Sequence, residues 1–357
     1  MASTVFFVKA ARQDGDSLLS RKAFRIFSEM GLEREMGKKD FVALKIHFGE
    51  KGNKGYIRPA WLSGIIGSLK KNTARAYITD TNTLYRGQRA NSVDHLKLAA
   101  GHGFLFEKLG VPVIIADGLI GRDAQEVSTQ NRQIQKARLA GAFLHTDYLV
   151  CLSHFTGHLL TGFGAAIKNL GMGCASRAGK LDQHSVVHPR IKAEECERCY
   201  LCMEYCPAEA IERGGESAFI VDEKCIGCGE CLVVCPEGAV KMQWDEDVIR
   251  IQQKMAGYAA SVRRLFDGRL ACLNFLLRMT KNCDCMSKDE PAIVKDIGIL
   301  GSRDPVAVDK ASIDLINEKH GRDLFRETWN VDWRVQLRHA QELGAGNQSY
   351  ELIEIGA

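Results

Sequence analysis

The chain has 357 residues, of which 45% are hydrophobic and 26% are charged, and this composition is typical of a folded globular protein. Its formal net charge of +4 is too small to indicate nucleic-acid binding. The N-terminal residues lack the basic segment and long apolar run of a secretory signal, and no apolar run approaches the length of a membrane span. We therefore expect a cytoplasmic protein that binds neither nucleic acid nor membrane.

Strand and helix patterns alternate along the chain. The first part predicts, in order, a strand at 5–10, helix at 17–30, strand at 41–48, helix at 58–71, strand at 75–79, helix at 92–109, strands at 111–116 and 147–153, and a Gly-rich entry to a helix at 161–170. The last part predicts a helix at 246–266, strands at 270–277 and 293–300, and helices at 304–319 and 332–343. This alternation indicates an α/β fold with a parallel or mixed sheet.

Eight of the 13 cysteines lie in two matched runs between these parts. Each run reads C-x2-C-x2-C-x3-C-P, the first from Cys196 to Pro207 and the second from Cys225 to Pro236. The spacing resembles that of bacterial two-cluster ferredoxins, in which each run contributes ligands to both [4Fe–4S] clusters. Zinc sites and disulfides are the structural alternatives. Zinc ribbons use C-x2-C pairs rather than four-cysteine runs, and a large chain without a signal peptide is a poor context for a disulfide framework.

The spacing also divides the cysteines between two clusters. Three cysteines at intervals of three can wrap one cluster in a tight loop, while the fourth points away and serves the other cluster. One cluster is therefore assigned to Cys196, Cys199, Cys202 and Cys235. The other is assigned to Cys206, Cys225, Cys228 and Cys231. We expect an α+β two-cluster ferredoxin-like domain at 191–244, inserted into an α/β domain whose two parts are 1–190 and 245–357.

Three further stretches carry a family resemblance. They are the Gly-rich segment from Thr161 to Cys174, the Cys283-Asp-Cys285 motif, and the segment from Asp296 to Asp309. Together they resemble the DUF362 family, whose members are often described as uncharacterised iron–sulfur centre proteins. The resemblance covers nearly the whole chain and implies a fold with a ferredoxin insert. It implies no particular reaction.

Polar residues follow several of the predicted strands. In open α/β sheets, sites lie beyond the carboxyl ends of the strands, so we expect one pocket there. Its predicted members are Lys45, His47, Asp80, Asn82, Asp117, Ser153, His154, His158 and Lys168. We take His154, His158 and Lys168 as the candidate catalytic residues. The alternative for Lys168 is a solvated or helix-capping lysine beside a tight turn.

The stretch from His158 to Lys168 also resembles, over this one short segment, the nickel-pincer lactate racemase family. In that family a histidine, a Gly-rich turn and a lysine follow one another similarly. We infer no cofactor from so short a match.

Three cysteines outside the ferredoxin-like runs are candidates for further chemistry. Cys174, Cys283 and Cys285 are a possible third metal site, or two of them a redox pair, and the alternative is that they are small buried hydrophobes. C-x-C spacing is awkward for a disulfide, which favours metal binding. Cys151 and Cys272 fall within apolar strand patterns and are expected in the core.

These patterns predict an iron–sulfur redox protein, either an oxidoreductase or an electron-transfer protein that serves one, whose two [4Fe–4S] clusters relay single electrons to or from a site in the α/β domain. Its partner would be an electron donor or acceptor protein or a small redox molecule. Two alternatives remain open. One is a binding or maturation protein with structural or sensing clusters, and the other is a non-redox, metal-assisted isomerase or lyase.

Overall fold

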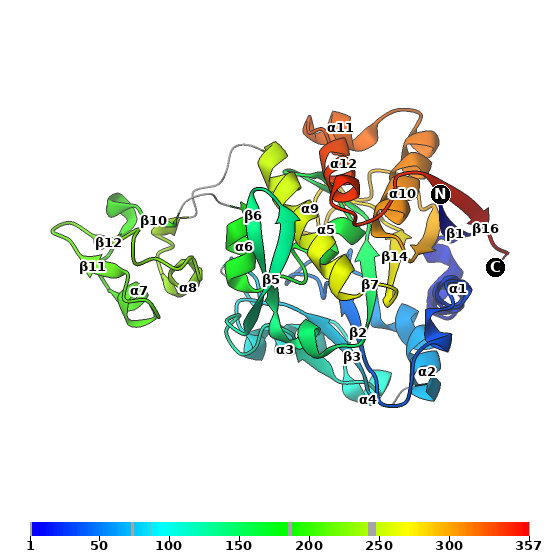
Figure 1. Cartoon of the computed structure of the whole chain (residues 1–357), viewed down its shortest axis with the longest axis horizontal. Helices are drawn as coiled ribbons and strands as arrows, with labels where there is room; N and C mark the ends of the chain where they lie inside the picture. Colours follow the sequence, from blue (N-terminus) through cyan, green and yellow to red (C-terminus); the bar gives the residue numbers. More distant parts are fainter. Residues whose placement is uncertain (1, 73–74, 86, 185–187, 242–247, 357) are drawn as a thin grey trace.

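The computed structural model describes residues 2–72, 75–85, 87–184, 188–241 and 248–356. Its largest feature is an eight-stranded sheet in the order β16-β1-β15-β14-β7-β2-β3-β4 (Figure 1). The strands are β1 (Ser3–Lys9), β2 (Phe41–Ile46), β3 (Arg75–Asp80), β4 (Val113–Ile115), β7 (Tyr148–His154), β14 (Leu270–Leu276), β15 (Gly298–Ser302) and β16 (Tyr350–Glu354). Only β15 pairs antiparallel with its neighbours, so the predicted α/β fold with a mixed sheet is confirmed.

Helices cover both faces of the sheet. One face packs against α1 (Gly15–Glu29), α2 (Ser63–Asn72), α3 (Ser92–Gly101) and α4 (Phe106–Leu109). The other packs against α5 (Ala166–Gly171), α9 (Val248–Leu265), α10 (Pro305–His320), α11 (Leu324–Trp329) and α12 (Arg334–Glu342). α6 (Arg177–His184) contacts α9. Short 3-10 helices are η1 (Arg12–Asp14), η2 (Leu32–Arg34), η3 (Pro59–Leu62), η4 (Gly141–His145) and η5 (Ala193–Glu195).

The alternation of side chains in β2 explains why a polar site forms at its end. Val42 and Leu44 join the apolar cluster on the α1–α2 face, whereas Ala43 joins the opposite one. Because successive side chains point to opposite faces, Lys45 lies on the same face as Ala43. That is the face covered by α5, which carries Lys168.

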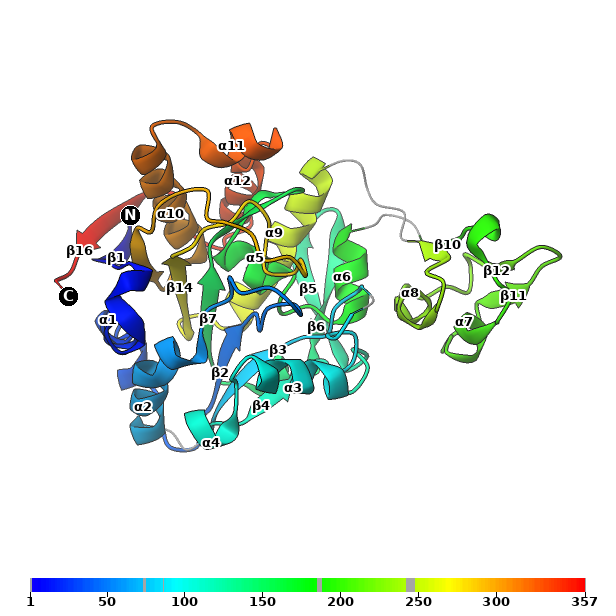
Figure 2. The ribbon, with the colours of Figure 1, turned by 180° about the vertical axis from the view of Figure 1, so that it is seen from behind.

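Residues 188–241 form a small cysteine-rich unit with its own apolar cluster. It contains β10 (Arg190–Ile191) paired with β13 (Val240–Lys241), β11 (Ile211–Arg213) paired with β12 (Ala218–Ile220), and the helices α7 (Leu201–Glu204) and α8 (Glu230–Val234). The unit lies at one end of the molecule, with α8 on the side toward α6 (Figures 1 and 2). The predicted domain boundary at 244/245 lies outside the described residues.

The structure differs from the predicted elements at a few places. The predicted helix at 92–109 is two helices, because the chain turns at Gly103 with φ of 92°. Within the Gly-rich entry to a helix that was predicted at 161–170, Gly162–Gly164 is β9, which pairs with β8 (Thr156–His158), and α5 begins at Ala166. The sequence also did not predict the hairpin of β5 (Ala124–Asn131) and β6 (Ile134–Ala140). No helix in the described ranges combines the length and hydropathy needed to cross a membrane.

Candidate functional site

A pocket lies beyond the carboxyl ends of the neighbouring strands β2 and β7. Its empty space, including the open mouth, is about 970 Å³. α2, which follows β2, covers one face of the sheet, whereas α5, which follows β7, covers the other. The chain thus diverges to opposite faces at this point, which is where open α/β sheets bind ligands. The walls come from strand ends, from α5 and α6, and from the segment containing Cys283 and Cys285.

Lys45 and Asp80 form a buried ion pair at the floor of the pocket. Lys45 Nζ lies 2.8 Å from Asp80 Oδ1 and donates a 2.8 Å hydrogen bond to Asn169 Oδ1. Burial acts to raise the pKa of Asp80, but Lys45 and the other basic groups around it outweigh burial and hold that pKa well below its usual value. Asp80 is therefore a carboxylate that neutralises part of the positive charge of this site.

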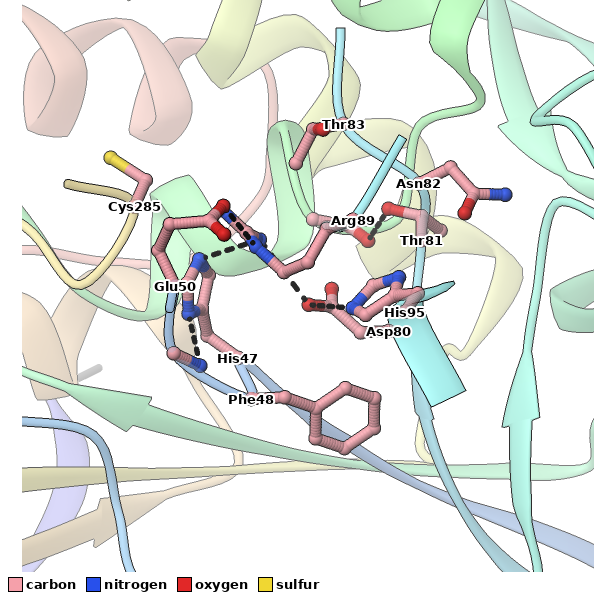
Figure 3. Close-up of polar contacts among 12 residues, drawn as sticks. His47, Phe48, Glu50, Asp80, Thr81, Asn82, Thr83, Arg89, His95 and Cys285 are labelled. Carbon is pink, nitrogen blue, oxygen red and sulfur yellow. Dashed lines mark hydrogen bonds and ion pairs between the residues drawn. The ribbon is translucent and has the colours of Figure 1, made fainter. Parts of the chain in front are cut away.

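Arg89 links the other polar groups at this floor (Figure 3). Its Nε donates to Glu50 Oε2 at 3.0 Å, and its Nη1 lies 2.9 Å from His47 Nε2. The backbone N–H of Gly49 donates to His47 Nδ1 at 2.9 Å. Burial, and after it the charge of Arg89, lowers the pKa of His47 far below its ordinary value. His47 is thus a neutral imidazole, and its single acceptor nitrogen takes a hydrogen bond from only one of these two donors.

His154 is held as a cation. Its Nδ1 lies 2.9 Å from Asp284 Oδ2, and its Nε2 lies 2.8 Å from the carbonyl oxygen of Leu277. Because both of these oxygens only accept hydrogen bonds, both ring nitrogens must carry protons. Burial opposes that charge, but Asp284 outweighs it and raises the pKa of His154. His154 therefore lies in the predicted pocket as a fixed cation whose two nitrogens are already engaged.

His158 and Lys168 are the two groups left available to a ligand. The N–H of Leu160 points at His158 Nδ1 from 3.3 Å, and the Thr161 hydroxyl lies 3.0 Å from the same nitrogen, so it is Nε2 that remains for a ligand. Burial and then Lys168 lower the pKa of His158 well below its usual value. Among the described residues, none forms a hydrogen bond or ion pair with the Lys168 ammonium, and burial lowers its pKa to about 8.

Most of the residues predicted for this pocket do line it. They are Lys45, His47, Asp80, Ser153, His154, His158 and Lys168. The other two, Asn82 and Asp117, do not, because the amide groups of Asn82 donate to Asp117 Oδ1 from its backbone at 2.9 Å and from its side chain at 3.0 Å.

Other lining residues were missed by the sequence analysis. They include Tyr85, Arg89, Lys180 and His184. Lys180 Nζ donates to Thr81 Oγ1 at 2.6 Å and to the Ala175 carbonyl at 2.7 Å, and burial lowers the pKa of Lys180 to about 8. The only signal for Arg89 was its place in the polar segment after β3.

The structure does not bring the three remaining candidate cysteines together. Cys283 and Cys285 form a disulfide with each other at the pocket wall, contrary to the expectation from their C-x-C spacing. Cys174 does not line the pocket, and its thiol lies 3.8 Å from the Asn169 carbonyl oxygen. In the described part of the chain, no three His, Cys, Asp or Glu side chains are arranged to hold a single metal ion.

The cysteine-rich unit contains two small cavities, each with about 340 Å³ of empty space including its open mouth. The first is lined by Cys196, Cys199, Cys202 and Cys235. The second is lined by Cys206, Cys225, Cys228 and Cys231. Each cavity therefore gathers the four cysteines that the spacing assigned to one cluster, and this segment is suited to binding clusters.

Both halves of this unit share details that suit thiolate ligands. The N–H of Ala210 points at Cys206 Sγ from 3.3 Å, and the N–H of Ala239 points at Cys235 Sγ from 3.2 Å. Three residues of the first half with left-handed backbone, Arg198, Tyr200 and Glu209, have glycine at the equivalent positions of the second half. The two loops thus wrap their cavities with the same backbone conformation.

One protein-family model matches the chain. The family model described as "Domain of unknown function (DUF362)" matches residues 42–314. A search of curated proteins finds no match.

Two solved structures resemble the chain distantly. One is the lactate racemase apoprotein from Thermoanaerobacterium thermosaccharolyticum, with 14% identity and a TM-score of 0.38 over 77% of this chain and 50% of that one. The other is a Thermotoga maritima protein solved by the Northeast Structural Genomics Consortium, with 7% identity and a TM-score of 0.43 over 86% of this chain and 59% of that one. The chain thus spans between half and three-fifths of the length of these two structures.

Proposed function

The chain belongs to the DUF362 family, and from that premise we propose that it is an iron–sulfur oxidoreductase. Its two [4Fe–4S] clusters relay single electrons between an external low-potential donor or acceptor and a small anionic substrate in the pocket. Cys196, Cys199, Cys202 and Cys235 hold one cluster. Cys206, Cys225, Cys228 and Cys231 hold the other. The clusters supply one-electron chemistry, and the α/β unit supplies the substrate site.

The observation that carries this proposal is the position of Leu84. Leu84 lines the pocket, and a Cβ added to Gly229 would lie 2.9 Å from Leu84 Cδ1. Gly229 directly follows the cluster ligand Cys228. The same side chain therefore belongs to the pocket wall and to the surface on which a cluster-binding loop packs. A carrier with no substrate site would need neither the pocket nor this contact.

Two arginines of the α/β unit hold the cysteine-rich unit at this place. The buried guanidinium of Arg177 donates to Glu230 Oε1, and Arg122 Nε lies 3.4 Å from the same oxygen. Arg122 Nη2 also donates to the carbonyl of Tyr205 at 2.8 Å. Because Glu230 is the first residue of α8, these contacts orient the helix that carries Cys231.

The charges of the pocket favour an anion. Its carboxylates already have partners, since Asp80 pairs with Lys45 and Asp284 with His154. Glu50, which does not line the pocket, pairs with Arg89. Lys168 has no such partner among the described residues and presents its ammonium to the cavity. A carboxylate or phosphate would accept a hydrogen bond from the Lys168 ammonium beside His158. With a pKa of about 8, Lys168 can also give a proton to a reduced substrate near neutral pH.

The test is carried out on anaerobically purified holoprotein. Metal and sulfide analysis, with electron paramagnetic resonance before and after dithionite, should give about eight irons, about eight sulfides and reducible clusters. Reduced protein is then mixed with menadione sulfonate, an anionic quinone, or with menadione, its neutral parent. We expect faster cluster reoxidation by the anion, and loss of that preference in Lys168→Gln. Clusters that dithionite cannot reduce would instead support a binding or maturation protein, and a stoichiometric second metal would support a metal-assisted isomerase or lyase.

A further inference from the structure

We propose that Cys283 and Cys285 are a redox-active pair that accepts two electrons in succession from the clusters and stores them as a dithiol in the pocket. This inference deepens the proposed electron relay and rests on it. The two cysteines form a disulfide, and both line the pocket whose wall contains Leu84.

A structural role does not account for this disulfide. A disulfide stabilises a fold mainly by closing a loop in the unfolded chain, and its effect grows with loop length. Only Asp284 lies between these two cysteines, so the loop they close is minimal. The bond lies in the wall of the site where the proposed chemistry occurs, so its conversion to a dithiol would change that site directly.

The segment carrying the pair is fixed by the Gly-rich loop after β2. The N–H of Glu50 donates to the Asp284 carbonyl at 3.0 Å, and Asn53 Nδ2 donates to the Met286 carbonyl at 3.3 Å. A Cβ at Gly55 would lie 2.8 Å from Asp284 Oδ1, so glycine leaves the room that this carboxylate occupies. The two sulfurs can therefore open and reclose while their backbone is held in place.

Positive charge next to the pair suits its reduced form. Reduction of a disulfide creates thiolates, which nearby cations stabilise. The His154 imidazolium lies 2.9 Å from Oδ2 of Asp284, the residue between the two cysteines, and neutralises this carboxylate, which would otherwise oppose the thiolates. The ammonium of Lys168 faces the same cavity. Burial holds the pKa of Lys168 at about 8, so this ammonium can supply a proton near neutral pH.

The reaction balances with electrons from the clusters. The external low-potential donor reduces each cluster by one electron. The first electron that reaches the disulfide breaks the S–S bond to leave a thiolate and a thiyl radical, and the second converts the radical to a thiolate. Two protons complete the dithiol, one from Lys168, which is reprotonated by solvent, and one from solvent at the pocket mouth. The dithiol then gives two electrons and two protons to the substrate, and the S–S bond reforms.

Other cysteines in the same protein provide an internal control. Cys151 and Cys272 lie opposite each other on β7 and β14, with both side chains fully buried. Cys174 is equally buried. None of these three thiols lines the pocket. They should therefore react with an alkylating reagent only after unfolding, whatever the state of the clusters.

The experiment follows the pair by alkylation and mass spectrometry. Holoprotein is treated anaerobically with reduced methyl viologen, and native protein is then alkylated with iodoacetamide. Without the donor, the peptide containing Cys283 and Cys285 should be unalkylated and lighter than the dithiol form by two hydrogens. With the donor, both cysteines should be alkylated. Protein stripped of its clusters by a chelator should not respond to the same donor, and neither should Cys228→Ser.

Three outcomes would overturn the inference. They are a pair that stays closed after the clusters are fully reduced, thiols that are already open and alkylated in protein that has met no donor, and a stoichiometric metal that is lost in Cys283→Ser. A different result would overturn the relay itself, namely clusters that no low-potential donor reduces. Reoxidation by menadione sulfonate separates the two ideas, because an unchanged rate in Cys283→Ser and Cys285→Ser leaves the relay standing and removes the pair. Met286→Ala changes the exposed side chain next to Cys285 and is the matched control for the two cysteine variants.

Discussion

His154 Nδ1 lies 2.9 Å from Asp284 Oδ2, and the two side chains are only 4% and 7% exposed. The pair joins the end of β7 to the segment that carries Cys283 and Cys285, although His154 and Asp284 are far apart in the sequence. Two buried charges satisfy each other here, so removal of either one leaves the other uncompensated. The pair therefore fixes the disulfide segment against the sheet.

Asp284→Asn should destabilise the protein by about 3–5 kcal/mol at mildly acidic pH, because it leaves a buried imidazolium without its carboxylate. Asp284 raises the pKa of His154 above its ordinary 6.5. A raised histidine pKa stabilises the folded state fully below the unfolded pKa, and the effect is lost as pH rises through the folded pKa. The difference between variant and wild type should therefore shrink above neutrality. Urea unfolding at several pH values measures it, with Glu354→Gln, in an exposed pair with Lys9, as the control. A pH-independent difference would contradict the charge assignment.

Lys168 should make anion binding depend on pH. Because its pKa is lowered to about 8, the ammonium is present below that pH and lost above it. Affinity for menadione sulfonate, measured by calorimetry, should fall as pH passes about 8. Lys168→Gln should weaken binding roughly tenfold or more near neutral pH, the effect of removing one charge-assisted hydrogen bond. Lys168→Arg keeps its charge at all these pH values and should bind without the decline. A decline that persists in the arginine variant would assign the titration to another group.

Single cysteine substitutions should remove one cluster at a time. Cys202→Ala should lose the first cluster and Cys228→Ala the second, so iron should fall from about eight to about four per chain in each. Cys174 lies outside both cavities, so the control variant Cys174→Ala should keep all the iron. Iron and sulfide analysis with electron paramagnetic resonance reports the result. Full iron content in both ligand variants would remove the assignment.

Patterns that depend only on residues close together in the chain predicted their parts of the structure well. The cysteine spacing predicted which four cysteines share each cavity, because a three-residue interval leaves little conformational choice. The strand ends predicted most of the pocket, since the carboxyl ends of parallel strands meet at one edge. Arg89 and Lys180 reach the same pocket from a loop and from α6, whose positions depend on tertiary packing.

The errors have physical reasons that the sequence does not display. Asn82 follows β3 as expected, but both of its amide groups bind Asp117, which removes both residues from the site. The β5–β6 hairpin was missed because its strands are largely polar and exposed, and so lack the apolar run that marks a buried strand. For Cys283 and Cys285, the spacing favoured metal ligands, whereas the structure joins them to each other.

The contact of Glu230 with Arg177 and Arg122 should control electron transfer between the two units. Glu230→Gln leaves the buried guanidinium of Arg177 without its counter-charge, which typically costs about 3–5 kcal/mol and weakens the docked arrangement. Iron content should be unchanged, because Glu230 lines the second cavity but is not one of its four cysteine ligands. Cluster reoxidation by menadione sulfonate should slow by roughly tenfold or more, since each 1.4 kcal/mol corresponds to about a factor of ten.

The matched control is Glu212→Gln, the same substitution at an exposed ion pair with Lys224 inside the cysteine-rich unit. It should leave both iron content and reoxidation rate near the wild-type values. Stopped-flow absorbance at the cluster bands compares the two variants on equal iron. If Glu230→Gln transferred electrons as fast as Glu212→Gln, the pocket would not receive its electrons through this interface. The position of Leu84 between pocket and cluster loop would then have no part in the reaction.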